Sequence, residues 1–261
     1  MTKLLEHKNA IIYGAGGGLG GGVARTFARE GARLFLAGRT AGPLEAVAED
    51  IRKAGGTASV AVLDALDEAA VQEHLAGVVA EAGSVDVSFN LVTRGDVQGI
   101  PLLDMTAEDL LRPVTNGLRT TFLTARAAAR QMVGQGSGVI LSLTSGSARG
   151  LAPMMGGTGP ADAATETFLR YLAAEVGKAG VRVLGIYTAG VPETLTKEKL
   201  GAVSDSAPDP EELERMLGAM TMLGRAPRLH QVAEVAAFLA SDRAAGMTAT
   251  IANVTCGLVA G

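Results

Sequence analysis

The sequence has few of the features on which nucleic-acid-binding or secreted proteins depend. It contains no tryptophan, 3% aromatic residues and a net charge of −4 over 261 residues. With few rings for base stacking and no excess of positive charge, we expect no nucleic-acid partner. The only cysteine, Cys256, excludes an intrachain disulfide framework and fits a reducing compartment. No histidine lies near it in the sequence, so we interpret it as a small buried residue and not as a nucleophile.

Long hydrophobic runs and metal-ligand patterns are missing as well. No apolar run reaches the roughly 18 residues of a membrane span, and the N-terminal MTKLLEHKN lacks the apolar core of a signal peptide. His7, His74 and His230 have no partner at a metal-ligand spacing. The sequence therefore predicts a cytoplasmic protein with no membrane partner and no metal site.

Short apolar runs of strand type alternate with helical patterns along the chain. The runs are apolar on both faces, as strands of a parallel sheet covered by helices must be. This alternation predicts an α/β fold, a Rossmann-type three-layer sandwich around a doubly wound, seven-stranded parallel sheet in a single domain, 1–261. Strands are expected at 9–14, 32–38, 57–64, 85–92, 138–145, 181–187 and 249–254, and helices at 19–30, 43–54, 67–82, 107–133, 157–178 and 231–240.

One long connection, at about 188–224, interrupts this order. A connection of this length in a compact domain usually has a function, such as a lid over a site. The alternative is a surface excursion that carries one helix at 210–219. The methionines of this segment and of the preceding loop either line an apolar substrate pocket or fill the core; they are Met154, Met155, Met216, Met220 and Met222.

A glycine-rich loop follows the first expected strand. Gly14, Gly18 and Gly20 stand between this strand and a helix in IIYGAGGGLGGGVARTFARE. Small residues let the backbone approach a diphosphate, and the helix N-terminus points free N–H groups at it. Arg39 ends the second strand, where an arginine accommodates a 2′-phosphate and an acidic residue would bind a ribose hydroxyl. The pattern therefore favours NADP(H) over NAD(H).

Further stretches follow in an order that resembles a known family. They are YGAGGGLG, the strand DVSFNLVT, Asn116 in PVTNGLRTTF, Ser145 in GVILSLTSGS and the C-terminal GRAPRLHQVAEVAAFLAS. Over residues 8 to 257 the chain resembles the short-chain dehydrogenase/reductase family. The resemblance implies a dinucleotide-dependent oxidoreductase, and we expect cofactor contacts from Gly14, Gly18, Leu19, Gly20, Arg39, Asp64, Ala65 and Asn90.

The resemblance breaks at the residues that carry the chemistry of the family. That chemistry uses an Asn, a Ser, a Tyr and a Lys, which here correspond to Asn116, Ser145, Thr158 and Asp162. A Tyr phenol has a pKa near ~10, which a neighbouring ammonium lowers into a useful range. An aliphatic hydroxyl is a much weaker acid, and a carboxylate raises the pKa of a neighbouring acid. Asp162 nevertheless retains the capacity to accept hydrogen bonds from ribose hydroxyls.

Three hypotheses follow from this departure. The first is an NADP(H)-binding oxidoreductase with an atypical active site, in which Ser145, Asn116 or water handles the proton. The second is a non-redox protein of the same fold that serves as a pseudoenzyme, a small-molecule binder or a partner subunit. The third is a cofactor-free lyase or cyclase. We expect a small, apolar substrate, and the resemblance implies a homotetramer or homodimer built on the helices at 107–133 and 157–178.

Overall fold

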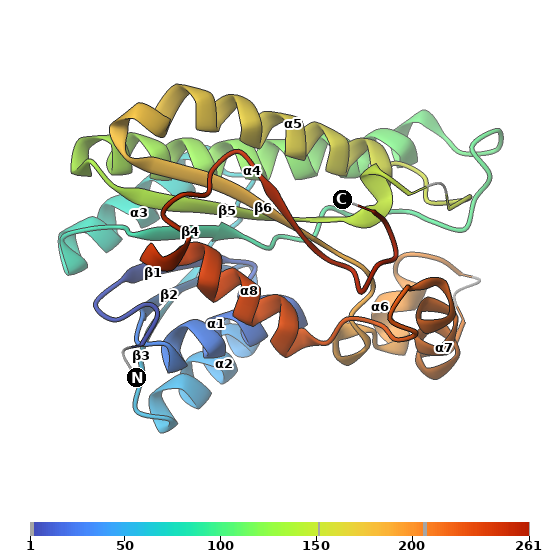
Figure 1. Ribbon diagram of the computed structural model, residues 1–261, viewed down its shortest axis with the longest axis horizontal. Coiled ribbons are helices and arrows are strands. Elements are labelled where there is room, and N and C mark those ends of the chain that lie inside the picture. Colours follow the sequence, from blue (N-terminus) through green and yellow to red (C-terminus); the bar gives the residue numbers. More distant parts are fainter. Residues whose placement is uncertain (1–2, 151, 206–207, 261) are drawn as a thin grey trace.

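The centre of the protein is a seven-stranded sheet in the order β3-β2-β1-β4-β5-β6-β7 (Figure 1). The computed structural model describes residues 3–150, 152–205 and 208–260. All neighbouring strands in the sheet are parallel, and the predicted strands and Rossmann-type fold are confirmed. The strands are β1 (Asn9–Tyr13), β2 (Arg33–Gly38), β3 (Thr57–Val62), β4 (Val87–Asn90), β5 (Gly138–Ser145), β6 (Val181–Thr188) and β7 (Ile251–Val254).

Two layers of helices cover the sheet, one on each face (Figure 1). One layer holds α1 (Gly18–Arg29), α2 (Ala41–Lys53) and α8 (Leu229–Ala240), and the other holds α3 (Glu68–Ala82), α4 (Ala107–Gln135) and α5 (Thr158–Val176). Because side chains alternate along a strand, Ile12 of β1 packs into the first layer and Ile11 into the second. The six helices predicted between the strands are confirmed, with ends shifted by a few residues.

The connection after β6 forms a separate group of short helices beside the carboxyl edge of the sheet (Figure 1). It holds a 3-10 turn (Pro192–Thr194), α6 (Lys197–Gly201) and α7 (Pro210–Met220). The helix predicted at 210–219 is confirmed as α7. The five-residue α6 was not predicted, because it is too short to show a helical period; the Thr196 hydroxyl caps it by accepting from the Lys199 N–H. Residues 206 and 207 of the predicted lid lie outside the described residues.

The direction of the chain connections changes at β1. This strand pairs with β2 on one side and with β4 on the other. In sheets of this kind a ligand crevice opens at the carboxyl ends of the strands at such a switch point. The glycine loop, Asn90 and Ser145 all lie at this edge, so the topology brings the predicted site residues to one end of the sheet. Within the described ranges no helix has the length and apolarity to cross a bilayer.

Candidate active site

The glycine loop is packed so closely that side chains are excluded at two of its positions. A Cβ on Gly14 would lie 2.5 Å from the carbonyl oxygen of Leu91, and Gly14 has a φ of +79°. A Cβ on Gly20 would lie 2.2 Å from the carbonyl oxygen of Gly14. The glycines therefore let the start of α1 rest directly on the end of β1.

The N-terminus of α1 is left uncapped and free of negative charge. Gly17 at the N-cap makes no side-chain hydrogen bond, and no acidic residue lies in the first turn. The N–H groups of Gly18, Leu19 and Gly20 are those that an α-helix leaves without an intrahelical partner. With the positive end of the helix dipole, free N–H groups of this kind suit a diphosphate group, and the cofactor contact of these three residues stays a prediction.

The residues predicted to contact the adenosine half of a cofactor lie at the ends of β2 and β3. Arg39 is exposed, and no ion pair within the described ranges involves it. Asp64 is also exposed, and its Oδ1 accepts a hydrogen bond from the Leu66 N–H at 2.9 Å. Ala65 is buried. The Arg39 side chain is therefore exposed to solvent, and one carboxylate oxygen of Asp64 is engaged within its own loop.

The two predicted asparagines hold the loop that follows β4. The Asn90 amide donates to Thr121 Oγ1 at 3.0 Å, and its Oδ1 accepts from the Val92 N–H at 3.1 Å. The Asn116 amide of α4 donates to the carbonyl oxygen of Arg94 at 3.1 Å. Both side chains thus fix the backbone path that carries Arg94 into the site.

Thr158 and Asp162 lie one turn apart on α5, and both are buried. Asp162 is completely buried, and its Oδ2 accepts a hydrogen bond from Ser145 Oγ at 2.5 Å. Thr158 donates its hydroxyl proton to Asp96 Oδ1 at 2.9 Å and accepts from the Gln98 amide at 3.0 Å. The structure therefore joins Ser145 to Asp162, whereas the Thr158 hydroxyl is engaged by the loop after β4.

The cation of the site is Arg94, which follows β4. Its guanidinium pairs with the buried carboxylate of Asp162 and, at 3.1 Å, with Asp96. The side chain of Arg94 is 16% exposed and that of Asp96 19%. A Cβ on Gly117 of α4 would lie 2.5 Å from Arg94 Cδ, so the helix leaves room for this arginine. The result is a cluster of one cation and two carboxylates, of which Asp162 is fully buried and Arg94 and Asp96 are partly buried.

Arg94, Asp96 and Gln98 were not predicted from the sequence. They lie in an irregular loop, and Arg94 is 68 residues from Asp162. One signal could have found Arg94: an aspartate on a helix that packs against the sheet requires a cation wherever it is buried, because an unpaired buried charge is strongly destabilising. The arginine beside the carboxyl end of β4 is placed to supply that charge.

Burial raises the pKa of Asp162, although Arg94 and the Ser145 hydroxyl act in the opposite direction. Burial alone would lower the pKa of Arg94, but the carboxylates of Asp162 and Asp96 outweigh it and hold the pKa above its ordinary value. Arg94 therefore stays charged, while two carboxylates share one cation. Such a cluster can take up a proton at Asp162 and release it again.

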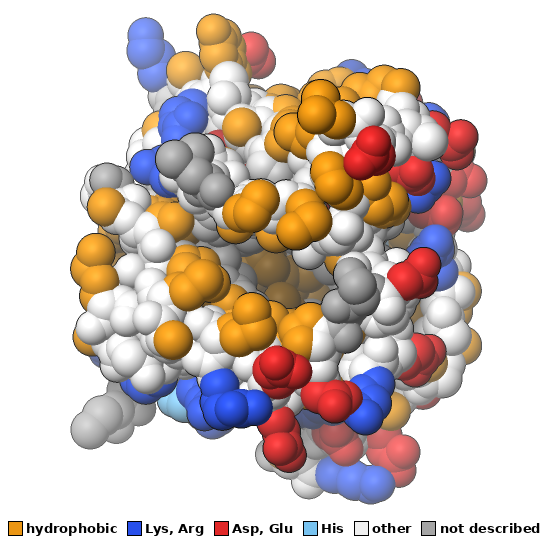
Figure 2. Space-filling model, turned by 90° about the vertical axis from the view of Figure 1, so that its right-hand side faces the viewer, with side chains coloured by type: hydrophobic (Ala, Val, Ile, Leu, Met, Phe, Trp, Pro, Cys, Tyr) orange, Lys and Arg blue, Asp and Glu red, His pale blue; other side chains and the backbone are white. Residues whose placement is uncertain are grey.

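Apolar side chains are exposed on the lid and on the loops after β4 and β5, and we call them the apolar rim. Figure 2 shows apolar side chains around a hollow on the face that carries the lid. Exposed apolar residues of the lid and of the loops after β4 and β5 include Leu102, Leu103, Met154, Met216, Met220 and Met222. Two backbone hydrogen bonds tie these segments together, from Gly99 N–H to the Met154 carbonyl at 2.8 Å and from Gln98 N–H to the Val203 carbonyl at 2.9 Å.

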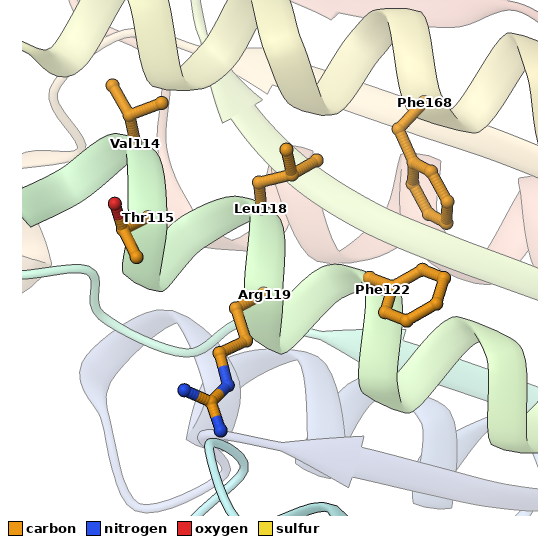
Figure 3. Close-up of a pocket in the computed structure, with 6 residues that line it drawn as sticks. All are labelled: Val114, Thr115, Leu118, Arg119, Phe122 and Phe168. Atoms are coloured by element: carbon orange, nitrogen blue, oxygen red, sulfur yellow. The ribbon is translucent and has the colours of Figure 1, made fainter. Parts of the chain in front are cut away.

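A second apolar feature is formed by side chains of α4 and α5 (Figure 3). It is a cavity of about 500 Å³ lined by Val114, Thr115, Leu118, Arg119, Phe122 and Phe168. The rings of Phe122 and Phe168 meet edge to face with centroids 5.9 Å apart. Of the described residues that line this cavity, Arg119 alone has a charged side chain. Among the described residues no group of three or more His, Cys, Asp or Glu side chains is placed to hold a metal ion.

Comparison with known proteins gives matches over nearly the whole chain. The family described as enoyl-(acyl carrier protein) reductase matches residues 14–259. L-rhamnose 1-dehydrogenase (NAD(P)(+)) of Azotobacter vinelandii is 34% identical over 262 residues, with 98% of each chain covered. The structure of a 7α-hydroxysteroid dehydrogenase with NADH and 7-oxo glycochenodeoxycholic acid has a TM-score of 0.87 at 28% identity, covering 98% of this chain and 96% of that one. A short-chain type dehydrogenase/reductase from Mycobacterium marinum has a TM-score of 0.85 at 25% identity and covers 100% of this chain and 98% of its own.

Proposed function

Because the chain belongs to the short-chain dehydrogenase/reductase family of oxidoreductases, we propose that it is NADP(H)-dependent and moves its proton through Ser145 and Asp162. In this proposal Thr158 and Asp162 occupy the positions at which the family carries Tyr and Lys. The observation that carries it is the 2.5 Å hydrogen bond from Ser145 Oγ to the fully buried Asp162 carboxylate.

The proton path is written for oxidation of an alcohol to a carbonyl compound. When bound, NADP⁺ supplies the acceptor for the hydride that leaves the carbinol carbon. Ser145 Oγ takes the hydroxyl proton of the substrate and passes its own proton to Asp162. Arg94 holds the carboxylate in place and compensates its charge before the transfer. In reduction the protonated Asp162 returns its proton through Ser145 to the carbonyl oxygen.

The preference for NADP(H) rests on Arg39. Its exposed guanidinium, free of ion pairs among the described residues, stands at the end of β2. An arginine at this place accommodates the 2′-phosphate of NADP(H). The expected consequence of Arg39→Ala is a loss of NADPH affinity with little change for NADH.

The apolar rim supports an apolar small-molecule substrate, with its hydroxyl or carbonyl group at Ser145. The similar 7α-hydroxysteroid dehydrogenase was solved with NADH and 7-oxo glycochenodeoxycholic acid, an acid whose steroid ring system is apolar. In this proposal the lid, at about 188–224, closes over the apolar part of the substrate.

The outer face of α4 and α5 supports a homodimer or homotetramer. Phe122 is 39% exposed and Tyr171 71% exposed on these two helices, and Phe122 and Phe168 line the cavity of Figure 3. Aromatic side chains of this size are favourable at protein interfaces. Light scattering coupled to size exclusion is expected to give a dimer or tetramer for the natural chain and a smaller species for Phe122→Glu.

The first experiment is a thermal unfolding titration with NADPH, NADH and buffer. A ligand that binds only the folded state raises stability by RT ln(1 + [L]/Kd), about 2.7 kcal/mol at a ligand concentration of 100 Kd. A larger shift with NADPH than with NADH, reduced selectively by Arg39→Ala, supports the proposal. No shift with either ligand contradicts it and favours cofactor-free chemistry. Binding without hydride exchange for any alcohol or ketone favours the non-redox alternative.

A restoring variant tests whether Thr158 and Asp162 occupy the Tyr and Lys positions. Thr158→Tyr with Asp162→Lys alone would place an ammonium against the Arg94 guanidinium, and like charges in a buried site repel. The triple variant that adds Arg94→Ala removes this conflict. We expect NADPH-dependent ketone reduction from the triple variant and not from the double one. A folded triple variant that binds NADPH but reduces no ketone would contradict the assignment of these positions.

A further inference from the structure

One lysine of the lid lies beside the phosphate loop. Lys199 Nζ is 3.4 Å from the position that a Cβ would take on Gly18, and Thr194 Cγ2 is 2.9 Å from the same position. Among the described residues no ion pair involves Lys199. Lys197, two residues earlier on α6, instead pairs with Asp209 at 2.8 Å. The lid thus brings one unpaired ammonium to the first residue of α1.

We propose that Lys199 binds the diphosphate of the dinucleotide and so couples cofactor binding to closure of the lid. The inference rests on the proposed function, because it assumes that the glycine loop holds a dinucleotide. In this arrangement the N–H groups of Gly18, Leu19 and Gly20 donate to the diphosphate from the start of α1. The Lys199 ammonium donates to it from the lid. An ammonium–phosphate contact is a charge-assisted hydrogen bond, which is stronger than a bond between neutral groups.

The position of α6 is linked to the catalytic cluster. The carbonyl oxygen of Val203, shortly after α6, accepts the Gln98 N–H at 2.9 Å. The Gln98 amide in turn donates to Thr158 Oγ1 at 3.0 Å. A diphosphate held by Lys199 therefore fixes α6 and, through Gln98, the loop that carries Arg94.

The test compares Lys199→Gln with the matched control Lys197→Gln. Binding of NADPH, ADP-ribose and adenosine 2′-monophosphate is measured by calorimetry. Lys199→Gln is expected to lower the affinities for NADPH and ADP-ribose about tenfold. This is the lower end of the range for a hydrogen bond to a charged group, because the lysine is exposed. It should leave adenosine 2′-monophosphate unchanged, because this probe lacks the diphosphate. Lys197→Gln should change none of the three affinities, and Lys199→Arg should retain them.

Hydrogen exchange gives a second readout of the coupling to the lid. NADPH is expected to protect the amides of residues 197–203 in the natural chain and in Lys197→Gln, and not in Lys199→Gln. Equal NADPH affinity for the natural chain and Lys199→Gln would overturn the inference. A loss of affinity for adenosine 2′-monophosphate in Lys199→Gln as large as the loss for NADPH would also overturn it. If the natural chain binds none of the probes, the proposed function fails together with the inference. If it binds them and Lys199→Gln binds equally well, only the inference fails.

Discussion

Removing the cation that pairs with Asp162 should destabilise the protein in a manner that depends on pH. Arg94→Met keeps much of the side-chain volume and deletes the guanidinium. Asp162, which is completely buried, then retains only neutral donors of Ser145 among the described residues outside its own helix. Breaking a buried ion pair in this way costs about 3–5 kcal/mol.

The carboxyl can limit this loss by taking up a proton. A carboxyl group with an ordinary pKa near 3.9 is protonated at pH 7 at a cost of about 4 kcal/mol, because each pH unit corresponds to about 1.36 kcal/mol. The variant cannot lose more stability than this through Asp162, because protonation would then be the cheaper alternative. In the variant the folded-state pKa of Asp162 lies further above its unfolded value, so the stability it contributes is present below about pH 4 and is lost as the pH rises. We therefore expect a loss of about 3–4 kcal/mol at pH 7 and of less than about 1 kcal/mol at pH 4.

Urea unfolding at the two pH values measures this difference. Arg112, which pairs with Asp109 at 2.8 Å and is 37% exposed, gives the matched control: Arg112→Met should cost less than about 1 kcal/mol at either pH. The double variant Arg94→Met with Asp162→Asn should regain most of the lost stability. A loss for Arg94→Met that is the same at both pH values, or a double variant in which the two losses add, would refute the reasoning.

Three further outcomes follow from contacts and pKa shifts. Gly117→Ala should lower the free energy of unfolding by about 1–2 kcal/mol, because the alanine Cβ would meet Arg94 Cδ at 2.5 Å. This loss is expected although alanine is the better helix former. Gly134→Ala, in open space on the same helix, should instead stabilise the protein in the same urea assay. Burial lowers the pKa of His74 to about 4, so natural-chain stability should fall by about 1–3 kcal/mol as the pH drops from about 6.5 to about 4, and not in His74→Leu. For alcohol oxidation, kcat/KM should rise with pH as Asp162 loses its proton, and Asp162→Asn should lack this limb; an identical pH profile in both proteins would exclude Asp162 as the base.

The fold could be predicted from the sequence because each element carries its own local signal. Strands such as 181–187 are apolar on both faces, and the glycine loop stands in the context, strand before and helix after, that gives such a pattern meaning. α6 escaped prediction because five residues are too few for a period. The sequence pattern was thus sufficient to predict an element wherever that pattern was local and longer than about two helical turns.

The site could be predicted only in part, for a related reason. Thr158 and Asp162 share one face of a helix, so their proximity follows from their spacing. Arg94 comes from a loop without any period, and only tertiary packing brings it to Asp162. The cation that pairs with the buried Asp162 carboxylate comes from another element, and this pairing depends on the fold as a whole.

The same cluster has a consequence for the speed of turnover. The loop after β4 is fastened to α5 through Arg94 and Asp162 and to the lid through Gln98 and Val203. If the product leaves between loop and lid, one of these attachments must open, and opening the first exposes the fully buried Asp162 carboxylate to water. Loop opening of this kind takes microseconds to milliseconds and limits the rate of many enzymes. We therefore expect a pre-steady-state burst of NADPH formation, with product release as the slow step.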